Sequence, residues 1–323
     1  MPTALDLAPG VRQSQRRAVA RALTAVENAL PGADALVDAL YPHTGRAWRI
    51  GITGPPGAGK STLTNRLVGA FRERGQTVAV VAVDPSSPFT GGALLGDRVR
   101  LADRVDDDGV FVRSLAARGA LGGLAEAAEA ACDVLDAAGY DVILLETVGV
   151  GQGEIDVAEA ADTVLVVLVP ESGDAVQAMK AGLMEVADVF GVNKADHPEA
   201  GHLVRALRQM LRLRAGGGEV RRGGGEEGGR RGAPAVVKTS ALHGEGIGGL
   251  VEALDAHRAR LDDAWDERRE ARLRRRVRRL VEAAWRRDFW SEARHRALAE
   301  SVRQLDAAER APHALAARVL AQG

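Results

Sequence analysis

A glycine-rich stretch from Gly54 to Thr62 combines the residue types that bind a polyphosphate. Its G-x-x-x-x-G-K-S-T spacing lets successive backbone N–H groups point at a phosphate, and a helix starting near Lys60 adds its positive end. In this motif the lysine contacts the β- and γ-phosphates, and the hydroxyl of Ser61 binds Mg²⁺. The residues predicted to bind nucleotide here are Gly54, Pro55, Pro56, Gly57, Ala58, Gly59, Lys60, Ser61 and Thr62.

The flanking sequence supports this interpretation. Residues 48–53 read as a short buried strand, and residues 62–68 read as a helix with Leu63 and Leu67 on one face. A Gly-Pro turn that matches the motif by chance is the alternative, and it would not need a strand before it and a helix after it.

Two carboxylates are candidate Mg²⁺ ligands. Asp84 follows the buried run 77–83, and Asp97 lies in the loop rich in glycine and proline that comes next. The carboxyl end of a strand beside a phosphate-binding loop is where such a metal is held. The alternative for Asp84 is a cap on the turn before Pro85, and Asp97 is equally open to a loop role.

A third acidic position follows the buried strand 140–145. Glu146-x-x-Gly149 is a variant of the Asp-x-x-Gly pattern, in which the acid polarises Mg²⁺ through a water and the glycine N–H contacts the γ-phosphate. Gln152 is a candidate for orienting the attacking water, with a solvated loop amide as its alternative. Lys180 lies on a predicted helix near the nucleotide, and its alternative is a solvated helix lysine.

The tetrapeptide Asn193-Lys194-Ala195-Asp196 selects the base. A carboxylate at Asp196 accepts hydrogen bonds from N1–H and the exocyclic amine of guanine, and adenine offers neither pattern. Asn193 is expected to tie this loop to the phosphate-binding loop, with the stem of Lys194 over the base. The backbone N–H groups of Ser240, Ala241 and Leu242 are expected to reach the guanine carbonyl, so the order of these elements favours GTP over ATP.

Bulk composition excludes several other functions. The 323 residues carry 43 basic and 44 acidic side chains, for a net charge of −1, which gives no general case for nucleic acid or membrane binding. The single cysteine, Cys132, and the scattered histidines do not form a zinc or nickel pattern. No apolar run reaches the length of a membrane span and no signal peptide is evident, so we expect a cytoplasmic protein.

The order of the elements predicts an α/β fold with a mostly parallel sheet flanked by helices. The predicted parts are an N-terminal helical extension (1–45), a nucleotide-binding domain (46–257) and a C-terminal helical arm (258–323). The segment 215–233, dominated by Gly, Arg and Glu, is predicted to be a disordered insertion. Residues 258–296 read as one long charged helix whose narrow apolar stripe needs a partner surface.

Taken together, these motifs resemble the MeaB/ArgK-type GTP-binding proteins, which are chaperones of adenosylcobalamin-dependent mutases such as methylmalonyl-CoA mutase. The resemblance covers nearly the whole chain apart from the insertion. The stretches that carry it are 51–61, 83–97, 146–152, 173–182, 188–196 and 315–320.

This resemblance implies a P-loop GTPase fold and a Mg²⁺ ion held with help from Ser61, Asp84, Asp97 and Glu146. It also implies that Lys180 lies on a switch segment responding to the mutase, and that the C-terminal arm builds a homodimer. GTP hydrolysis would then serve loading or protection of the mutase cofactor, with no cobalamin bound by this chain itself. Two departures, Gly153 for a usual serine and Gly191 for a β-branched strand residue, raise a question of local rigidity.

Three rival functions stay open at this point. One is a kinase of a transport-system protein, although no base beside an acceptor hydroxyl is recognisable. Another is a GTP-binding scaffold with negligible hydrolysis. The third is a nickel-insertion GTPase, which the lack of clustered histidine and cysteine disfavours.

Overall fold

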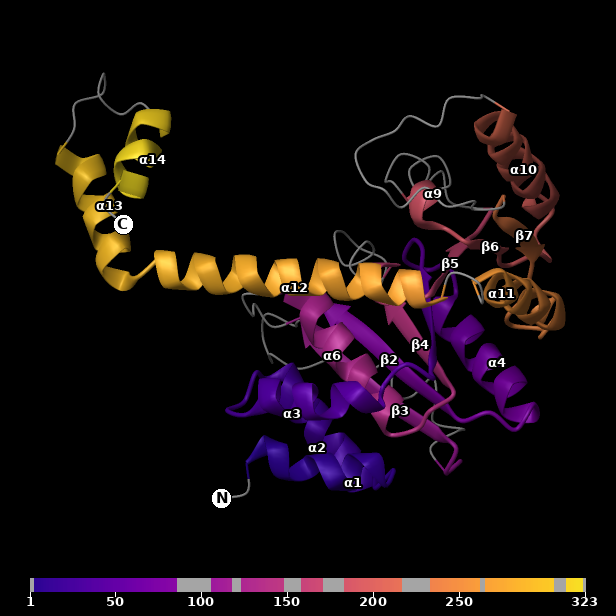
Figure 1. Ribbon diagram of the computed structural model, residues 1–323. Helices are drawn as coiled ribbons and strands as arrows, with labels where there is room; N and C mark the ends of the chain where they lie inside the picture. Colours follow the sequence, from indigo (N-terminus) through magenta and orange to yellow (C-terminus); the bar gives the residue numbers. More distant parts are fainter. Residues whose placement is uncertain are drawn as a thin grey trace. The chain divides into compact units, whose positions relative to one another are not determined.

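A computed structural model describes residues 3–85, 106–117, 123–147, 158–170, 183–216, 233–261, 265–304 and 312–321. Its centre is a seven-stranded sheet in the order β3-β2-β4-β1-β5-β6-β7, and every described strand pair is parallel. The strands are β1 (Trp48–Thr53), β2 (Val78–Pro85), β3 (Val110–Ala117), β4 (Val142–Thr147), β5 (Thr163–Leu168), β6 (Val189–Val192) and β7 (Ala235–Lys238). The predicted α/β class is confirmed (Figure 1), and in the strand order β1 lies at the centre with β4 and β5 beside it.

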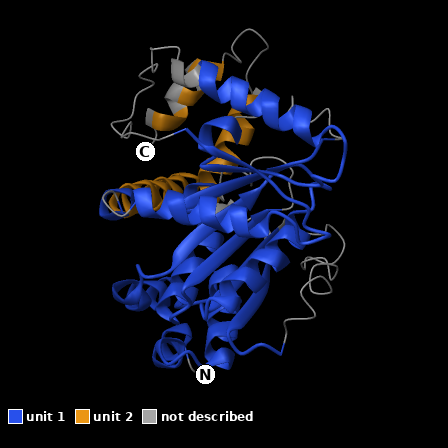
Figure 2. Ribbon diagram, turned by 90° about the vertical axis from the view of Figure 1, so that its right-hand side faces the viewer, with its two compact units in different colours: residues 1–268 blue, residues 269–323 orange. Residues whose placement is uncertain are grey.

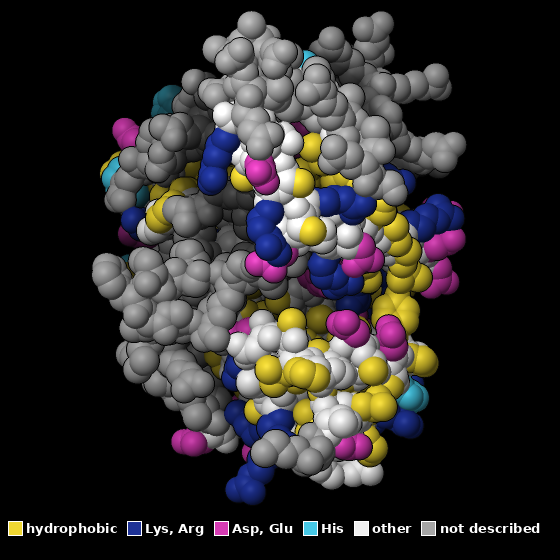
Figure 3. Space-filling view, turned by 90° about the vertical axis from the view of Figure 1, so that its left-hand side faces the viewer, with side chains coloured by type: hydrophobic (Ala, Val, Ile, Leu, Met, Phe, Trp, Pro, Cys, Tyr) yellow, Lys and Arg dark blue, Asp and Glu magenta, His cyan; other side chains and the backbone are white. Residues whose placement is uncertain are grey.

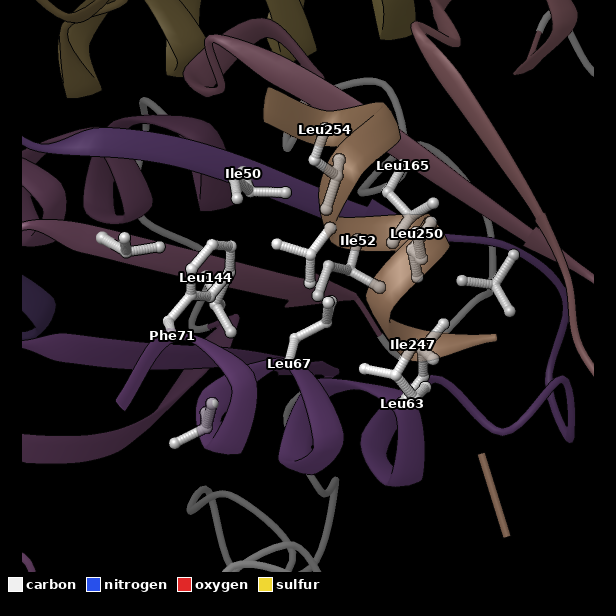
Figure 4. Close-up of a cluster of buried hydrophobic side chains, with 14 of the residues drawn as sticks. Ile50, Ile52, Leu63, Leu67, Phe71, Leu144, Leu165, Ile247, Leu250 and Leu254 are labelled. Atoms are coloured by element: carbon white, nitrogen blue, oxygen red, sulfur yellow. The ribbon is translucent and has the colours of Figure 1, made fainter. Parts of the chain in front are cut away.

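One face of the sheet is covered by α4 (Lys60–Glu73) and α11 (Ile247–Leu261). Leu63 and Leu67 of α4 and Leu250 of α11 converge on the strands in Figure 4, and all three are fully buried. The strands present alternate apolar side chains to these helices, as a sheet buried on both faces must. This packing fixes the helix that begins with Lys60 against the strand that precedes the phosphate-binding loop.

The opposite face carries two groups of helices. Over β2, β3 and β4 the apolar side chains pack with α6 (Gly123–Ala137) and the N-terminal elements, and over β5 and β6 they pack with α9 (Leu183–Val186) and α10 (Ala200–Gly216). The N-terminal elements are η1 (Ala4–Leu7), α1 (Ala8–Arg12), α2 (Arg16–Glu27), α3 (Ala33–Leu40) and η2 (Tyr41–His43). In the lower part of Figure 3, hydrophobic side chains of this N-terminal region are interspersed with charged ones.

A buried ion-pair cluster fixes the start of β1. The guanidinium of Arg49 lies 2.8 Å from Asp133 and 3.4 Å from Asp136, both on α6. Burial by itself lowers the pKa of Arg49, but the charges of the carboxylates, Asp133 foremost, raise it above its ordinary value. Asp136 also accepts hydrogen bonds from the N–H groups of Gly45 and Ala47, so the chain enters β1 in a defined position.

A second buried polar network lies where β5 and β6 begin. The indole of Trp48 donates to Thr163 Oγ1 (2.9 Å), which lies 2.9 Å from His257 Nδ1. His257 Nε2 lies 3.1 Å from Asp188 Oδ1, and the N–H of Val164 donates to the other oxygen of Asp188 (3.0 Å). The network therefore ties α11 to three neighbouring strands.

The structure corrects two expectations about the helices and adds one helix that the sequence does not predict. Residues 258–296 are not one helix, because α11 ends at Leu261, α12 covers Trp265–Phe289 and α13 covers Glu292–Gln304. The break before α13 has a local cause, since the N–H of Arg294 donates to the side chain of Ser291 (3.3 Å), as at a helix N-cap. The sequence predicts no helix over 200–214, where α10 lies, and α10 also includes Ala215 and Gly216 of the predicted insertion. Of the other residues of the predicted insertion, 217–232 lie outside the described residues and Ala233 lies within them.

Gly191 does not interrupt its strand. It pairs with Val167 of β5 and Val237 of β7, and a Cβ built on it would lie 3.4 Å from a methyl group of Leu165. The local rigidity questioned from the sequence is therefore supplied by pairing on both sides. Gly153 lies outside the described residues.

The chain divides into two compact units, residues 1–268 and residues 269–323 (Figure 2). The first contains the sheet and its helices. The second contains most of α12, together with α13 and α14 (Pro312–Ala321), and no residue of α12 is buried. The three-part division at 45 and 257 stays a prediction.

Candidate nucleotide-binding site

The phosphate-binding loop connects β1 to α4 and its shape depends on two glycines. Gly54 has φ +138°, and a Cβ there would lie 2.1 Å from the carbonyl oxygen of Val167. Gly59 has φ +82°, and its Cβ would lie 2.5 Å from the side-chain nitrogen of Asn193. Only glycine fits both positions, because each combines a left-handed backbone with close contact to another segment. The loop residues Pro55, Pro56, Gly57 and Ala58 lie between them, with Ala58 buried.

Lys60 and Ser61 open α4 on the inner side of this loop. The ammonium of Lys60, which is 6% exposed, donates to the carbonyl oxygens of Gly54 (2.7 Å) and Pro55 (3.0 Å). The hydroxyl of Ser61 donates to a carboxylate oxygen of Glu146, which is buried at the end of β4. Thr62 follows on the exposed side of the helix.

The hydroxyl of Ser61 and the carboxylate of Glu146 are a donor set that suits Mg²⁺, which prefers oxygen ligands. Register places the backbone of Asp84 at the same edge, because Val83 of β2 lies opposite Thr147, which follows Glu146 in β4. Among the described residues, no three His, Cys, Asp or Glu side chains gather as a metal-binding cluster. A site with two protein oxygen ligands leaves coordination positions for phosphate and water, which is the usual arrangement for this metal.

Four predicted site residues, Asp97, Gly149, Gln152 and Lys180, lie outside the described residues. Their roles stay predictions.

The other end of the site is formed by the loops after β6 and β7. Asn193, which is 3% exposed, donates from its amide nitrogen to the carbonyl of Ala58 (2.8 Å). Its amide oxygen accepts from the N–H of Ala241 (3.0 Å) and from the hydroxyl of Thr239 (3.3 Å). The expected tie between the two loops is therefore present, and one side chain joins three segments distant in sequence.

Asp196 is oriented by its neighbour across this corner. The hydroxyl of Ser240 donates to Asp196 Oδ1 (2.8 Å), and this hydrogen bond, followed by one from the backbone of Asp196, holds the pKa of the carboxyl below its ordinary value. Asp196 is exposed and therefore ionised at neutral pH, which is the acceptor form that guanine requires. Lys194 has a left-handed backbone with φ 54°, which turns the chain between Asn193 and Asp196.

Two of the three backbone N–H groups predicted to reach the guanine carbonyl already donate to other atoms of the protein. The N–H of Ser240 donates to the carbonyl of Glu245 (2.9 Å), and the N–H of Ala241 donates to Asn193. The N–H of Leu242 has no acceptor within the described part of the chain, so it is the donor of this trio best suited to a guanine carbonyl.

Comparisons with known proteins agree with this geometry. The model of the family described as methylmalonyl Co-A mutase-associated GTPase MeaB matches residues 19–294. The chain belongs to the MeaB family. It is a P-loop GTPase and a GTP hydrolase, and the family resemblance stated from the sequence is confirmed.

Two relatives and one solved structure show how far the similarity extends. A Pyrococcus abyssi relative that carries a GTPase name is 47% identical over 277 residues, covering 86% of this chain and 81% of the relative. GTPase ArgK of Escherichia coli is 44% identical over 212 residues, covering 62% of this chain and 64% of ArgK. A crystal structure of LAO/AO transport system kinase has a TM-score of 0.72 at 26% identity and covers 98% of this chain and 96% of that one.

One contact of this MeaB-family site was not predicted from sequence. Arg66 of α4 donates from Nε to the carbonyl of Ala241 and from Nη2 to the carbonyl of Leu242, both at 2.8 Å. No sequence signal distinguishes Arg66 from the other arginines of an arginine-rich chain, because its partners are backbone atoms of a distant loop.

No helix in the described residues is both long enough and apolar enough to cross a membrane.

Proposed function

We propose that this GTPase couples GTP hydrolysis to cofactor loading or protection of an adenosylcobalamin-dependent acyl-CoA mutase. The observation that carries the proposal is the match of a mutase-associated GTPase family to residues 19–294. One relative supports the same proposal by its name. A mouse protein named methylmalonic aciduria type A homolog is 38% identical over 207 residues, covering 62% of this chain and 46% of that protein.

In this proposal, the loops after β6 and β7 select the nucleotide. Asp196 accepts from N1–H and the amine of guanine, and the N–H of Leu242 donates to the guanine carbonyl. The stem of Lys194 lies over the base. These roles are supported by the ionised state of Asp196 and by the Asn193 hydrogen bonds that join both loops to Ala58.

In this proposal, residues of the phosphate-binding loop and of the carboxyl ends of β2 and β4 carry out hydrolysis. Lys60 and the backbone N–H groups of the loop bind the β- and γ-phosphates and stabilise the negative charge that develops as water attacks in line. Ser61 and Glu146, with Asp84 and Asp97, would hold Mg²⁺. When bound, the ion supplies positive charge that neutralises the phosphate oxygens. The N–H of Gly149 contacts the γ-phosphate, Gln152 orients the water, and Lys180 responds to the mutase.

The C-terminal arm is proposed to form a homodimer. Five apolar side chains of α12 lie 38–65% exposed at roughly helical spacing: Leu273, Val277, Leu280, Val281 and Trp285. An apolar stripe of this kind on a charged helix needs a covering surface. Sedimentation of the full chain is expected to show a dimer that Leu280→Glu converts to a monomer, and a wild-type monomer would contradict this role.

The rival with specific support is a protein kinase function, because the solved structure that covers 98% of this chain carries a transport system kinase name. A kinase must place a base beside an acceptor hydroxyl. In the described part of the site the buried carboxylate of Glu146 is bonded to Ser61, which fits metal binding better. Transfer of labelled γ-phosphate to a candidate acceptor protein would favour the kinase.

The decisive experiment is GTP turnover with and without a purified adenosylcobalamin-dependent mutase from the same organism. The mutase is expected to accelerate turnover, and Lys180→Ala is expected to abolish the acceleration. Turnover that no mutase changes would remove the proposed partner and leave the GTPase. Binding of GTP without measurable hydrolysis, even with a mutase, would favour the scaffold.

A further inference from the structure

Arg66 links the helix of the phosphate-binding loop to the loop that faces the guanine. It lies on α4, the helix that Lys60 and Ser61 begin. Its two hydrogen bonds use Nε and Nη2, the parallel pair of donors on one edge of the guanidinium, and they reach two successive carbonyls, those of Ala241 and Leu242.

These bonds act near the tip of the loop, beyond the hydrogen bonds that close its base. The base of the loop is closed by two hydrogen bonds between Ser240 and Glu245, of 2.9 and 3.1 Å. Ala241 is buried, but Leu242 at the tip is 73% exposed. Gly244, with φ +77°, turns back toward the guanidinium, since a Cβ on it would lie 3.7 Å from Arg66 Cζ.

We propose that Arg66 is a positioning residue for guanine selection, which holds the peptide between Ala241 and Leu242 so that its N–H meets the guanine carbonyl. The inference rests on the proposed guanine site and names a residue that acts on it from outside. Arg66 itself contacts neither base nor phosphate in this account.

The chemistry of the peptide unit strengthens the argument. The carbonyl of Ala241 and the N–H of Leu242 belong to the same peptide group. A cationic donor on that carbonyl draws electron density from the group and makes the N–H a stronger donor. Arginine suits this task better than lysine, because a single ammonium cannot present two parallel donors in a fixed plane.

The test compares GTP with 6-thio-GTP, which differs only by sulfur in place of the guanine carbonyl oxygen and is a weaker acceptor. Equilibrium affinities of both nucleotides are measured with Mg²⁺ for wild type, Arg66→Ala and Arg66→Lys. Wild type is expected to prefer GTP. Arg66→Ala is expected to reduce that preference by about fivefold or more, the worth of one hydrogen bond. Arg66→Lys is expected to resemble Arg66→Ala.

A matched control is available at the C-terminal cap of the same helix. Arg74 is 42% exposed and bonds to Asp255 of α11 (2.7 Å), away from the guanine loop. Arg74→Ala should keep the wild-type preference, and melting temperatures of both variants show whether each remains folded. An Arg66→Ala protein that loses affinity for GTP and 6-thio-GTP equally would overturn the proposal, because it would show a general structural role. Restoration of the preference by Arg66→Lys would also overturn it.

The same data separate this inference from the proposed guanine site. Asp196→Ala should abolish the preference for GTP over ITP, which lacks the exocyclic amine, while keeping the preference for GTP over 6-thio-GTP. Wild type that does not distinguish GTP from ITP would contradict the guanine site itself. An intact GTP-over-ITP preference with an unaltered 6-thio-GTP ratio in Arg66→Ala would contradict the role of Arg66 alone.

Discussion

The two ends of the nucleotide site differ in what their side chains bind. At the base end, formed by residues 193–196 and 239–246, Asn193 joins Ala58, Thr239 and Ala241 through hydrogen bonds of 2.8–3.3 Å. At the phosphate end, formed by residues 54–62 and Glu146, the ammonium of Lys60 donates to carbonyls of its own loop.

This difference assigns a distinct task to each end. The contacts of Asn193 use atoms that guanine does not need, so they can persist when the base binds and keep Asp196 in place. In the proposed function, the donors of Lys60 are instead redirected to phosphate oxygens. We therefore expect substitutions at the base end to change which nucleotide binds, and substitutions at the phosphate end to change the rate of hydrolysis.

The largest effect is expected for Lys60→Ala. In the proposed mechanism the buried ammonium stabilises the charge of the transition state, so its loss should lower single-turnover GTP hydrolysis about 100- to 1,000-fold. Lys238→Ala, which removes an exposed lysine at the end of β7, is the control and should keep the wild-type rate. A Lys60→Ala enzyme whose rate of GTP hydrolysis is within about threefold of the wild-type rate would contradict the assignment of hydrolysis to the phosphate end.

A smaller effect is expected for Asn193→Ala, measured as the free energy of unfolding in urea. The substitution leaves buried groups of Ala58, Thr239 and Ala241 without their partner, so unfolding should require about 2–4 kcal/mol less. Asn28→Ala removes an amide at the C-terminal cap of α2, where it donates to the carbonyl of Thr24, and should cost less. Equal losses in the two variants would show that the base end is not specially held by Asn193.

The smallest effect is expected at Asp188, where β6 begins. Burial raises the pKa of Asp188, but the hydrogen bond and charge of His257 outweigh it and hold the pKa below its ordinary value. A carboxyl with a lowered folded pKa adds stability above its unfolded pKa, and this stability is lost as the pH falls through the folded value.

The contribution of Asp188 to stability is tested by measuring the free energy of unfolding of wild type and Asp188→Asn from neutral pH to about pH 3. Asp188→Asn should be less stable at neutral pH and show a shallower decline below about pH 4. Asp255→Asn, which removes an exposed carboxylate, controls for the general effect of lost negative charge. Parallel profiles for wild type and Asp188→Asn would contradict the role assigned to this network.

The sequence predicts the strands and both ends of the site for physical reasons. Buried parallel strands appear as continuous apolar runs, and the motifs at Gly54–Thr62 and Asn193–Asp196 need fixed residue types at fixed spacing. Helix α10 was missed although Val204, Leu207 and Leu211 are spaced for one buried face, because arginines and the following glycines dominate that segment.

The contact of Arg66 with Ala241 joins residues 175 positions apart and uses a backbone carbonyl, so no pattern of residue types in the sequence could predict it. The break at Ser291 is another limit, because a single N-cap serine inside a charged helical pattern is a weak signal without its hydrogen bond. Motifs thus predict which groups meet the nucleotide, while the groups that hold those motifs in place emerge only from tertiary structure.

The most direct test of the account is the affinity of wild type and Asp196→Ala for GTP and ATP in the presence of Mg²⁺. Wild type is expected to bind GTP at least about 100-fold more tightly than ATP, because adenine leaves the carboxylate of Asp196 unpaired. Asp196→Ala should bind the two nucleotides within about threefold of each other. A wild-type protein that binds ATP as tightly as GTP, or an Asp196→Ala variant that keeps the GTP preference, would contradict the assignment of base selection to this corner of the molecule.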